Sequence, residues 1–318
     1  MKYDVIIVNY KGKEVLGPTL DSLYASTVQP QHVIIIDNDS ADGSEAFIKK
    51  TYPTVEYVQT GANIGFGKAN NRGIDMTTSP YIFLVNNDLQ VEPTCAELLI
   101  KALESQEKAA VASPLIYRGW ERPAAEVYSY GATISSSGFT LNQEALPKKA
   151  GEANCFTGAC CMIKRSALGA ERFEKRYFLY YEEPELMIRL WKKGFEAIRV
   201  PKAECYHLEN HGSPAQAVAG LLFRQQYAVP NRWFALGKHW PAALLPYALS
   251  LNILHLFYLQ LYFLKNKKSG FLPVFYQAPV ALMSGIAQRK PGGKPWKQQL
   301  IPLSISQLFG AKSAVIKD

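Results

Sequence analysis

Short apolar runs alternate with helical stretches over the first 90 residues, and this alternation constrains the fold more than any other feature. The runs are continuous and rich in β-branched residues, which is typical of strands covered on both faces. Strands separated by helices favour a parallel sheet with right-handed crossovers. We therefore expect an α/β fold with a Rossmann-like, mostly parallel sheet flanked by helices. The expected strands lie at 5–8, 33–36, 55–58 and 81–85, and the expected helices at 13–25, 45–50 and 63–76.

Polar side chains follow three of these expected strands. Asn9 ends the first, Asp37 and Asn38 follow the second, and the tripeptide 86–88 (Asn-Asn-Asp) follows the fourth. Open parallel sheets bind ligands outside the carboxyl ends of their strands. No GxGxxG or Walker pattern accompanies these residues, so neither a dinucleotide site nor a P-loop is indicated. The sequence predicts a ligand site at this sheet edge.

Charge is divided unevenly along the 318 residues. Residues 220–318 contain 12 Lys or Arg and one acid, Asp318, a net charge of +11, whereas the whole chain carries +8 and residues 1–219 therefore −3. Two uncharged stretches, 242–264 and 271–287, flank a basic turn at 265–268. We expect a ligand-binding domain over 1–215. A basic, apolar, helical region over 216–318 is expected to associate with an anionic membrane surface.

The stretch 242–264 is long enough to span a bilayer, which takes about 20 apolar residues. It nevertheless contains polar residues, of which Asn252, His255 and Tyr262 share one helical stripe, as in a helix lying in the membrane interface. A single span would also place the basic turn opposite the basic flank at 232–238, against the positive-inside preference. An interfacial or re-entrant hairpin is favoured. A membrane-spanning hairpin and a soluble helix pair are the alternatives.

The cysteines and the N-terminus indicate the compartment. Five cysteines form no CxxC pair and leave an odd number, which suits a reducing compartment. The apolar run at 5–8 is too short for a signal peptide. We expect the cytoplasmic face of the inner membrane, with no nucleic-acid partner. The pattern does not specify an oligomeric state.

Six motifs, taken in order, resemble glycosyltransferase family 2, particularly its bacterial rhamnosyltransferase-like branch. They cover about residues 1–213. The motifs are VIIVNY (5–10), IIDNDSADGS (35–44), NIGFGKANNRGI (63–74), FLVNNDLQV (83–91), FTGACCMIKR (156–165) and YFLYYEEPELMIRLWKKGF (177–195). The resemblance implies the GT-A fold and an inverting, metal-dependent glycosyltransferase.

The resemblance also implies residues that hold a nucleotide-sugar donor. It places Asp37 and Asn38 at the nucleobase and Asn9 near the base and ribose, although an Asx turn is the structural alternative for Asp37. Gly65 would let the backbone approach the donor, and packing is the alternative for Asn70. The further donor-side residues are Asn63, Asn86 and Asn87.

The strand end at 86–88 lies where the family carries its DxD-type motif. A divalent cation, Mg²⁺ or Mn²⁺, would stabilise the charge that develops on a pyrophosphate leaving group. Asp88 is the expected ligand, and Asn86 in place of an acid more plausibly contacts ribose or phosphate. His207 is the second expected ligand, with His211 as a competitor because the spacing differs from the family pattern.

The family's catalytic carboxylate falls on Glu183, where the family usually has Asp. Inverting transfer needs one carboxylate to accept the proton of the attacking hydroxyl. Because Glu is one methylene longer, Glu182 and Glu185 are competitors. All three carboxylates would also suit the N-terminus of a helix. Arg189, one turn after Glu185, is expected to pair with it.

We expect transfer of a single sugar. dTDP-rhamnose is the first donor that the resemblance suggests, with UDP- and GDP-sugars open, and the acceptor is a glycan or lipid-linked oligosaccharide. A processive synthase would carry a QxxRW motif, but the spacing from Gln226 to Arg232-Trp233 is wrong. That synthase and a non-catalytic nucleotide-sugar-binding scaffold are the alternatives.

Overall fold

The computed structural model describes residues 1–121, 126–142, 154–208, 214–268, 270–290 and 300 of the chain. By their internal contacts the residues divide into two compact units. We call them the sheet unit (Met1–Thr133, Asn142–Phe178 and Glu182–Glu209) and the helical unit (Ile134–Leu141, Leu179–Tyr181 and Asn210–Asp318). The tripeptide Leu179–Tyr181 thus packs with the helical unit, although the chain on both sides of it belongs to the sheet unit.

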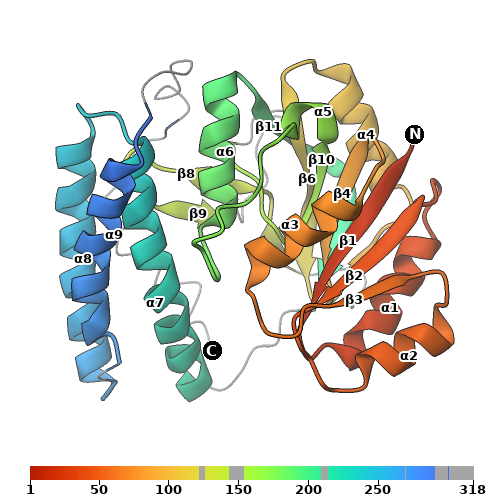
Figure 1. Ribbon diagram of the computed structural model, residues 1–318, viewed down its shortest axis with the longest axis horizontal. Coiled ribbons are helices and arrows are strands. Elements are labelled where there is room, and N and C mark those ends of the chain that lie inside the picture. Colours follow the sequence, from red (N-terminus) through yellow and green to blue (C-terminus); the bar gives the residue numbers. More distant parts are fainter. Residues whose placement is uncertain (122–125, 143–153, 209–213, 269, 291–299, 301–318) are drawn as a thin grey trace. The chain divides into compact units, whose positions relative to one another are not determined.

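The first seven elements of the sheet unit alternate strand and helix, which confirms the predicted pattern (Figure 1). They are β1 (Tyr3–Asn9), α1 (Lys13–Tyr24), β2 (His32–Asp37), α2 (Ser44–Thr51), β3 (Glu56–Gln59), α3 (Phe66–Met76) and β4 (Tyr81–Asn86). Helix α3 begins three residues later than expected. The backbone of Gly65 has φ +88°, and the side-chain oxygen of Asn63 accepts its N–H at 3.1 Å, so the chain turns before the helix starts.

The remaining strands make the sheet mixed. Among the described residues the main sheet has nine strands, in the order β3-β2-β1-β4-β10-β6-β11-β5, with β7 beside β6. Strands β1 to β4 are parallel, whereas β10 runs antiparallel to both β4 and β6. These later elements are β5 (Leu89–Val91), α4 (Cys95–Ser105), β6 (Ala109–Arg118), β7 (Val127–Ser129), β10 (Cys160–Lys164), α5 (Arg165–Leu168), α6 (Glu182–Lys193) and β11 (Glu196–His207).

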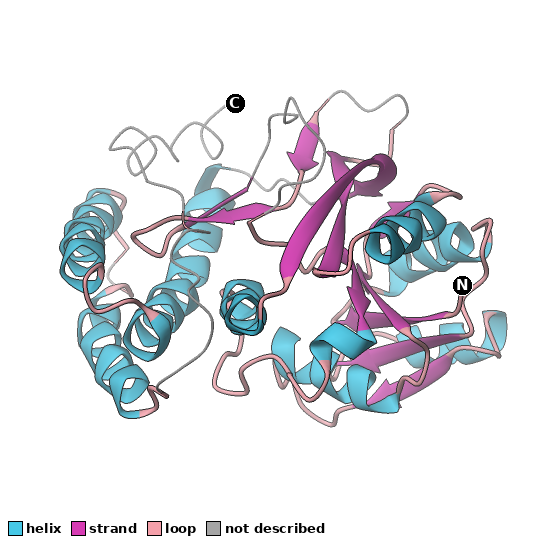
Figure 2. Cartoon of the chain, turned by 90° about the horizontal axis from the view of Figure 1, so that it is seen from above, coloured by secondary structure: helices cyan, strands magenta, loops and turns pink. Residues whose placement is uncertain are grey.

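Helices cover both faces of this sheet (Figure 2). Val5 and Ile7 of β1 pack in one cluster with Leu16 of α1. The intervening Ile6 faces α3, where a Cβ added to Gly73 would lie 2.6 Å from Ile6 Cγ2. Burial on both faces explains why the strands read as continuous apolar runs rather than as alternating patterns.

The strand register brings the predicted polar residues to one edge of the sheet. Asn9 lies opposite Asp37 in the β1–β2 pair, and Val8 lies opposite Asn86 in the β1–β4 pair. Because these strands are parallel, their carboxyl ends meet at the same edge. The predicted convergence of the three polar segments is therefore confirmed.

The helical unit is dominated by three helices, α7 (Pro214–His239), α8 (Leu245–Lys265) and α9 (Leu272–Ala287). The short strands β8 (Ala132–Ile134) and β9 (Thr140–Asn142) pair in a separate two-stranded sheet. Helices α7 and α9 approach closely through two glycines. A Cβ on Gly237 would lie 2.9 Å from the backbone nitrogen of Ile286, and a Cβ on Gly285 would lie 2.9 Å from that of Lys238. Only glycine fits at these positions without separating the helices.

Of the helices that the structure describes, α8 alone is long and apolar enough to cross a membrane, by length and composition. Its polar stripe does not face outward. Asn252 is fully buried, and its Oδ1 accepts a 2.6 Å hydrogen bond from Arg232 Nε of α7. Arg232 Nη2 also lies 3.4 Å from His255 Nδ1. Asn252 and His255 therefore serve the contact between α7 and α8, and the expected interfacial hairpin stays a prediction.

The five cysteines are all buried and all free. Cys95 and Cys160 lie in the same core cluster as β1 and α1, together with Cys205. The pKa of each thiol is raised above its usual value, at Cys95 by the hydrogen bond with Cys160 and then by burial, and at the other cysteines mainly by burial. The prediction that the cysteines form no disulfide framework is confirmed.

Candidate active site

The ends of β1 and β2 form a buried polar network. Asn9 Nδ2 donates to Asp37 Oδ1 at 2.8 Å and to Ser40 Oγ at 3.1 Å, while the Ser40 N–H donates to Asp37 Oδ2 at 3.0 Å. Asp37 is fully buried, and its carboxylate is held by these hydrogen bonds rather than by an Asx turn, because the backbone N–H that it accepts belongs to the third residue after it. A hollow of about 420 Å³ lies beside it, lined by Asp37, Tyr57, Gln59 and the start of α2. The nucleobase contact of Asp37 stays a prediction.

Asn38 retains an oxygen without a partner. Its Nδ2 lies 3.4 Å from the carbonyl oxygen of Gly65, and the residue is buried. Among the described residues no donor reaches its Oδ1. A buried amide oxygen without a partner is costly unless a ligand or water supplies the hydrogen bond. Asn38 is therefore a better candidate than Asp37 for a direct contact to a bound molecule.

The start of α3 is set by the protein's own backbone. The Phe66 N–H donates to the carbonyl oxygen of Phe178 at 2.9 Å, and a Cβ on Gly65 would lie 2.9 Å from the carbonyl carbon of Phe178. Gly65 is thus required by the approach of the chain at 178. Asn70 is buried, and its Nδ2 donates to the carbonyl oxygen of Phe66 at 3.1 Å. The packing alternative explains Asn70, and the donor roles of Asn63, Gly65 and Asn70 stay predictions.

Asn87 points back toward β1. Its Nδ2 donates to Asn9 Oδ1 at 2.8 Å, and its carbonyl oxygen accepts from Thr19 Oγ1 at 2.8 Å. A side chain at Gly12 would collide with this pair of amides. The structure therefore joins Asn9 and Asn87, which were predicted separately, in one hydrogen-bonded pair.

Asp88 and His207 meet at the end of β4 and β11. Asp88 Oδ1 lies 3.0 Å from His207 Nε2, and the Asp88 side chain is 27% exposed whereas that of His207 is 8% exposed. The ring of Tyr128 packs edge-on against His207 with centroids 4.7 Å apart. Tyr128 was not foreseen, because it lies outside the periodic segments of the sequence. The two residues predicted as metal ligands are thus neighbours.

This pair fits a divalent cation by its chemistry. The Asp88 carboxylate oxygen and the His207 imidazole nitrogen lie 3.0 Å apart, and both are ligand types that Mn²⁺ accepts, while the oxygen also suits Mg²⁺. Among the described residues no group of three or more His, Cys, Asp and Glu side chains surrounds a common point. Mg²⁺ is commonly held by one or two protein ligands with substrate phosphates and water. The arrangement agrees with a cation shared with a phosphorylated ligand.

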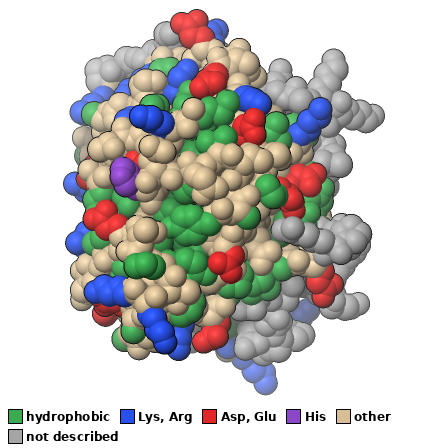
Figure 3. Space-filling view, turned by 90° about the vertical axis from the view of Figure 1, so that its right-hand side faces the viewer, with side chains coloured by type: hydrophobic (Ala, Val, Ile, Leu, Met, Phe, Trp, Pro, Cys, Tyr) green, Lys and Arg blue, Asp and Glu red, His purple; other side chains and the backbone are tan. Residues whose placement is uncertain are grey.

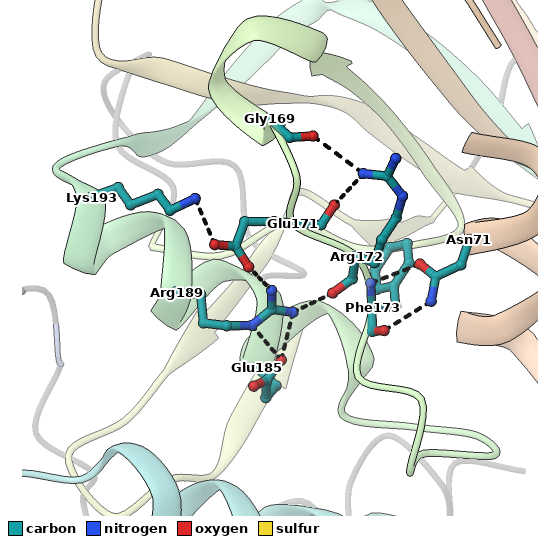
Figure 4. A network of polar contacts seen from close by, with 8 residues as sticks. All are labelled: Asn71, Gly169, Glu171, Arg172, Phe173, Glu185, Arg189 and Lys193. Atoms are coloured by element: carbon teal, nitrogen blue, oxygen red, sulfur yellow. Dashed lines mark hydrogen bonds and ion pairs between the residues drawn. The ribbon is translucent and has the colours of Figure 1, made fainter. Parts of the chain in front are cut away.

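Glu185 forms an ion pair with Arg189. It is fully buried, and Arg189 Nη2 lies 2.8 Å from its Oε2, which confirms the expected pairing one helical turn apart. Arg189 also pairs with Glu171, which in turn binds Lys193 at 2.6 Å. Figure 4 shows this network extending to Arg172, Phe173 and Asn71. A buried carboxylate neutralised by arginine is a poor proton acceptor.

The same network fixes the loop before α6. Asn71 of α3 accepts the Phe173 N–H at 2.8 Å and donates to the Phe173 carbonyl oxygen at 2.9 Å (Figure 4). The Phe173 ring packs against Phe66 with centroids 6.4 Å apart. These contacts hold α3, the loop at 169–173 and α6 together in the sheet unit.

Glu182 is buried without a partner for one oxygen. It is 1% exposed, its Oε1 has no hydrogen-bond partner among the described residues, and its Cγ would lie 3.2 Å from a Cβ on Gly67. Burial and the neighbouring Glu183 charge raise the pKa of its carboxyl well above the usual value. Glu182 is therefore a packed carboxyl whose surroundings favour its neutral form.

Glu183 combines partial exposure with a defined orientation. Its Oε1 accepts the N–H of Gly158 at 2.9 Å, and burial raises the pKa of its carboxyl. A side chain on Gly158 would collide with this oxygen. The hydrogen bond between Gly158 and Glu183 was not foreseen, because the two residues are 25 positions apart in the sequence. Of the three glutamates, Glu183 is the one with the geometry of a base.

The segment at 158–159 connects Glu183 to the end of β4, which is followed by the turn that carries Asp88. The Asn86 N–H donates to the carbonyl oxygen of Ala159 at 2.8 Å, next to the Gly158 N–H that binds Glu183. The candidate base and the candidate metal ligand thus stand at the same edge of the sheet. A carboxylate base beside a cation site suits the deprotonation of a hydroxyl that attacks a phosphorylated substrate.

A comparison with protein families matches residues 4–170 to the model described as "Glycosyl transferase family 2". The match covers more than half of the chain. A curated relative from Mycobacterium tuberculosis (strain CDC 1551 / Oshkosh), N-acetylglucosaminyl-diphospho-decaprenol L-rhamnosyltransferase, is 29% identical over 239 residues, which cover 66% of this chain and 76% of the relative.

Solved structures share the fold at low identity. The mannosyltransferase PcManGT from Pyrobaculum calidifontis, in complex with GDP-Man and Mn²⁺, has a TM-score of 0.54 at 16% identity and covers 99% of this chain and 81% of its own. GalNAc-T7 with UDP, GalNAc and Mn²⁺ has a TM-score of 0.57 at 15% identity and covers 74% of this chain and 47% of its own. The expected GT-A arrangement of sheet and helices is therefore confirmed.

Proposed function

The chain belongs to glycosyl transferase family 2, and on that premise we propose that it transfers a single sugar, with inversion, from a nucleotide-sugar donor to a lipid-linked or surface-polysaccharide acceptor. The resemblance to an L-rhamnosyltransferase that acts on a diphospho-decaprenol carrier supports dTDP-rhamnose as the donor and a lipid-linked glycan as the acceptor. The structural likeness to enzymes bound to GDP-Man or UDP supports a nucleotide diphosphate at the sheet edge.

One observation carries the catalytic assignment: the Glu183 carboxylate is oriented by the Gly158 N–H beside the end of β4, two residues before Asp88. In the proposed reaction the acceptor hydroxyl oxygen forms a bond to the anomeric carbon. The bond from that carbon to the diphosphate oxygen breaks, and the nucleoside diphosphate leaves on the opposite face. Glu183 accepts the hydroxyl proton, and its raised pKa makes it a stronger base than an exposed carboxylate.

Asp88 and His207 would hold the divalent cation, Mg²⁺ or Mn²⁺. When bound, the cation supplies positive charge against the diphosphate of the donor. Glu185 is a poor candidate for proton transfer because of its ion pair with Arg189, and Glu182 because its side chain is buried. Their function is to pack and orient the first turn of α6, from which Glu183 projects.

The test replaces Glu183 by Gln, which keeps size and removes basicity. Glu183→Gln is expected to lower kcat by at least about 10²-fold, the low end for general-base catalysis, while the Kd for dTDP-rhamnose stays within about twofold. Transfer to a decaprenyl-diphospho-N-acetylglucosamine is followed by product mass, and donor binding by calorimetry. Glu107→Gln, an exposed glutamate at the end of α4, is the matched control. Near-normal turnover of Glu183→Gln rejects the assignment.

We also propose that the protein docks on an anionic membrane, at the cytoplasmic face, through α8 and α9. The large side chains at 254, 257, 261 and 264 of α8 and at 272, 276, 280 and 283 of α9 are each more than half exposed. Phe257 contacts Phe275 with ring centroids 5.6 Å apart, so the two stripes adjoin. Residues 210–317 contain no Asp or Glu. An apolar surface in an acid-free, basic region suits the interface of an anionic bilayer.

The membrane proposal is tested by sedimentation with vesicles. Vesicles containing phosphatidylglycerol are expected to pellet the protein, and phosphatidylcholine vesicles to pellet less, because each basic residue near an anionic surface contributes about 1 kcal/mol. Pelleting should weaken at high salt. A protein that stays in the supernatant with both vesicle types contradicts the proposal.

A further inference from the structure

Two consecutive non-glycine residues before α6 adopt left-handed backbone conformations. Tyr180 has φ +67° and Tyr181 has φ +76°. Aromatic residues rarely adopt positive φ, because the Cβ crowds the backbone. Such residues persist where the surroundings hold them, and they cluster at functional sites. Tyr181 is followed in the chain by Glu182 and then Glu183, so this strained pair leads directly into the turn that carries the proposed base.

Asn231 of α7 holds the strained segment from the side of the helical unit. Its Nδ2 donates to the carbonyl oxygen of Leu179 at 3.0 Å and to that of Tyr180 at 2.8 Å. An amide nitrogen carries two hydrogens, so both donors are used on this segment. The side chain is buried, which makes the two bonds costly to lose. A third bond, from the Tyr181 hydroxyl to the carbonyl oxygen of Gly138 at 2.6 Å, holds the next residue.

The part of α7 that carries Asn231 is itself held in place by its neighbours. The residue after Asn231 is Arg232, whose guanidinium lies over the Phe139 ring at 4.0 Å and binds Asn252 of α8. Six residues after Asn231, Gly237 places α7 against the backbone of α9. Both neighbouring helices thus fix the stretch of α7 from which Asn231 projects. Asn231 holds the strained segment at a position set by the packing of the helical unit.

We propose that Asn231 is a positioning residue for Glu183: it holds the strained Tyr180–Tyr181 step and thereby aims the Glu183 carboxylate at the Gly158 N–H. The inference rests on the proposed role of Glu183 as the base. It assigns to a helix outside the sheet unit a part in setting the geometry of the reaction. Asn231 itself touches no reacting atom.

The experiment uses the full-length protein and measures amide hydrogen exchange in two peptides. The peptide at 179–186 reports the strained segment, and the peptide at 156–162 reports the Gly158 N–H that binds Glu183. Asn231→Leu keeps the size of the side chain and removes both donors. Exchange in both peptides is expected to rise by roughly tenfold or more, since exchange follows local opening. Exchange in a peptide of β1 should be unchanged.

Two further variants distinguish the loss of the Asn231 hydrogen bonds from a general loss of stability. Gln226→Leu removes an amide donor from the same helix, where Gln226 Nε2 bonds the carbonyl oxygen of Gly270 at 2.7 Å, and should leave both peptides unchanged. Tyr180→Gly lets residue 180 adopt positive φ without strain. Added to Asn231→Leu, it is expected to return exchange in both peptides toward the wild-type rate. Failure of that rescue, or a rise in every peptide, overturns the proposal.

Kinetics with dTDP-rhamnose and decaprenyl-diphospho-N-acetylglucosamine complete the test. Asn231→Leu should lower kcat by about 10-fold to 10²-fold, with the donor Kd unchanged, because a misplaced base slows chemistry without weakening binding. If the wild type transfers no sugar while both peptides respond, the proposed function fails and the positioning of the Glu183 carboxylate stands. If the wild type transfers sugar and Asn231→Leu has normal kcat and normal exchange, the proposed function stands and the positioning role is overturned.

Discussion

The sheet unit and the helical unit use their polar residues in opposite ways. In the sheet unit, polar side chains gather at the carboxyl ends of parallel strands, as Asn9, Asp37 and Asn86 do, and the hydrophobic residues stay in the core. In the helical unit, Asn231, Arg232 and Asn252 are buried while large apolar residues of α8 and α9 are exposed. Polar residues thus gather at a sheet edge in one unit and lie between helices in the other.

The surfaces differ in the same sense. On the side of α1 and α2, acidic, basic and hydrophobic side chains are interspersed (Figure 3). Residues 210–317, by contrast, contain no acid. A surface of mixed charge suits contact with water, whereas an acid-free region with an apolar stripe suits an anionic interface. Reaction chemistry and membrane contact should therefore respond to separate sets of substitutions.

The largest effect on sugar transfer is expected at Asp88, in the sheet unit. Asp88→Ala removes a cation ligand, so transfer should fall by at least about 10³-fold and the increase in donor affinity on adding Mn²⁺ should disappear. Vesicle binding should be unchanged. Asp88→Asn, which keeps one oxygen, is the matched variant and should retain more of the Mn²⁺ effect. Calorimetric titration of dTDP-rhamnose with and without Mn²⁺ measures it, and full activity of Asp88→Ala in EDTA would contradict the metal site.

A smaller effect is expected at Gly158. A methyl group there would collide with Glu183 Oε1 and lie 2.9 Å from Phe66 Cε1, so the carboxylate must move. Gly158→Ala is expected to lower kcat by roughly 10-fold to 10²-fold with little change in donor Kd. Gly220→Ala, on α7 with open space around it, is the control. Equal kcat for both variants would mean that the Gly158 bond does not set the position of the base.

The helical unit is probed by Leu261, which is 69% exposed. Leu261→Glu puts a charge into the apolar stripe and should weaken binding to phosphatidylglycerol vesicles by at least about tenfold, because both apolar burial and electrostatic attraction are reduced. Gln106→Glu adds the same charge at an exposed position of the sheet unit and should leave vesicle binding unaltered. Donor binding should be normal in both. If the two variants bind vesicles equally, this stripe is not the contact.

The smallest effect concerns pH and Glu182. Its folded-state pKa is raised, so between the unfolded pKa and the folded pKa the native state holds a proton that the unfolded state has released. Stability contributed by the protonated carboxyl is complete below the unfolded pKa and is lost as pH rises through the folded pKa. Glu182→Gln should therefore raise Tm more at pH 8 than at pH 5. Scanning calorimetry at the two pH values measures it, and an equal shift would refute the burial argument.

The first four strands of the sheet were predictable because the signal for each lies in a short stretch of sequence. The continuous apolar runs identify β1 to β4, and parallel pairing then requires Asn9, Asp37 and Asn86 to meet at one edge of the sheet. The antiparallel β10 was not predictable in this way. Its position between β4 and β6 depends on pairings between residues about 50 to 80 positions apart, which periodicity does not encode.

The candidate site was predictable in its residue types and less so in its roles. Three neighbouring glutamates look alike in sequence, and only tertiary contacts separate them: an arginine for Glu185, burial for Glu182 and the Gly158 N–H for Glu183. The partners of the polar stripe on α8 were not predictable for the same reason. A helical wheel shows that Asn252 and His255 share a side of the helix, but not that Arg232 of α7 occupies it.

The burial of all five cysteines has a practical consequence for measuring this protein. Thiol reagents attack the thiolate, and these sulfurs are shielded by burial and have raised pKa values, which result from the hydrogen bond with Cys160 and burial at Cys95 and mainly from burial at the others. The native protein should not react with a maleimide dye, so the rate of cysteine labelling would report the rate of unfolding. A single cysteine introduced at Leu261 would then be the one rapidly labelled position. A spin label or fluorophore attached there would report how deeply α8 enters a bilayer.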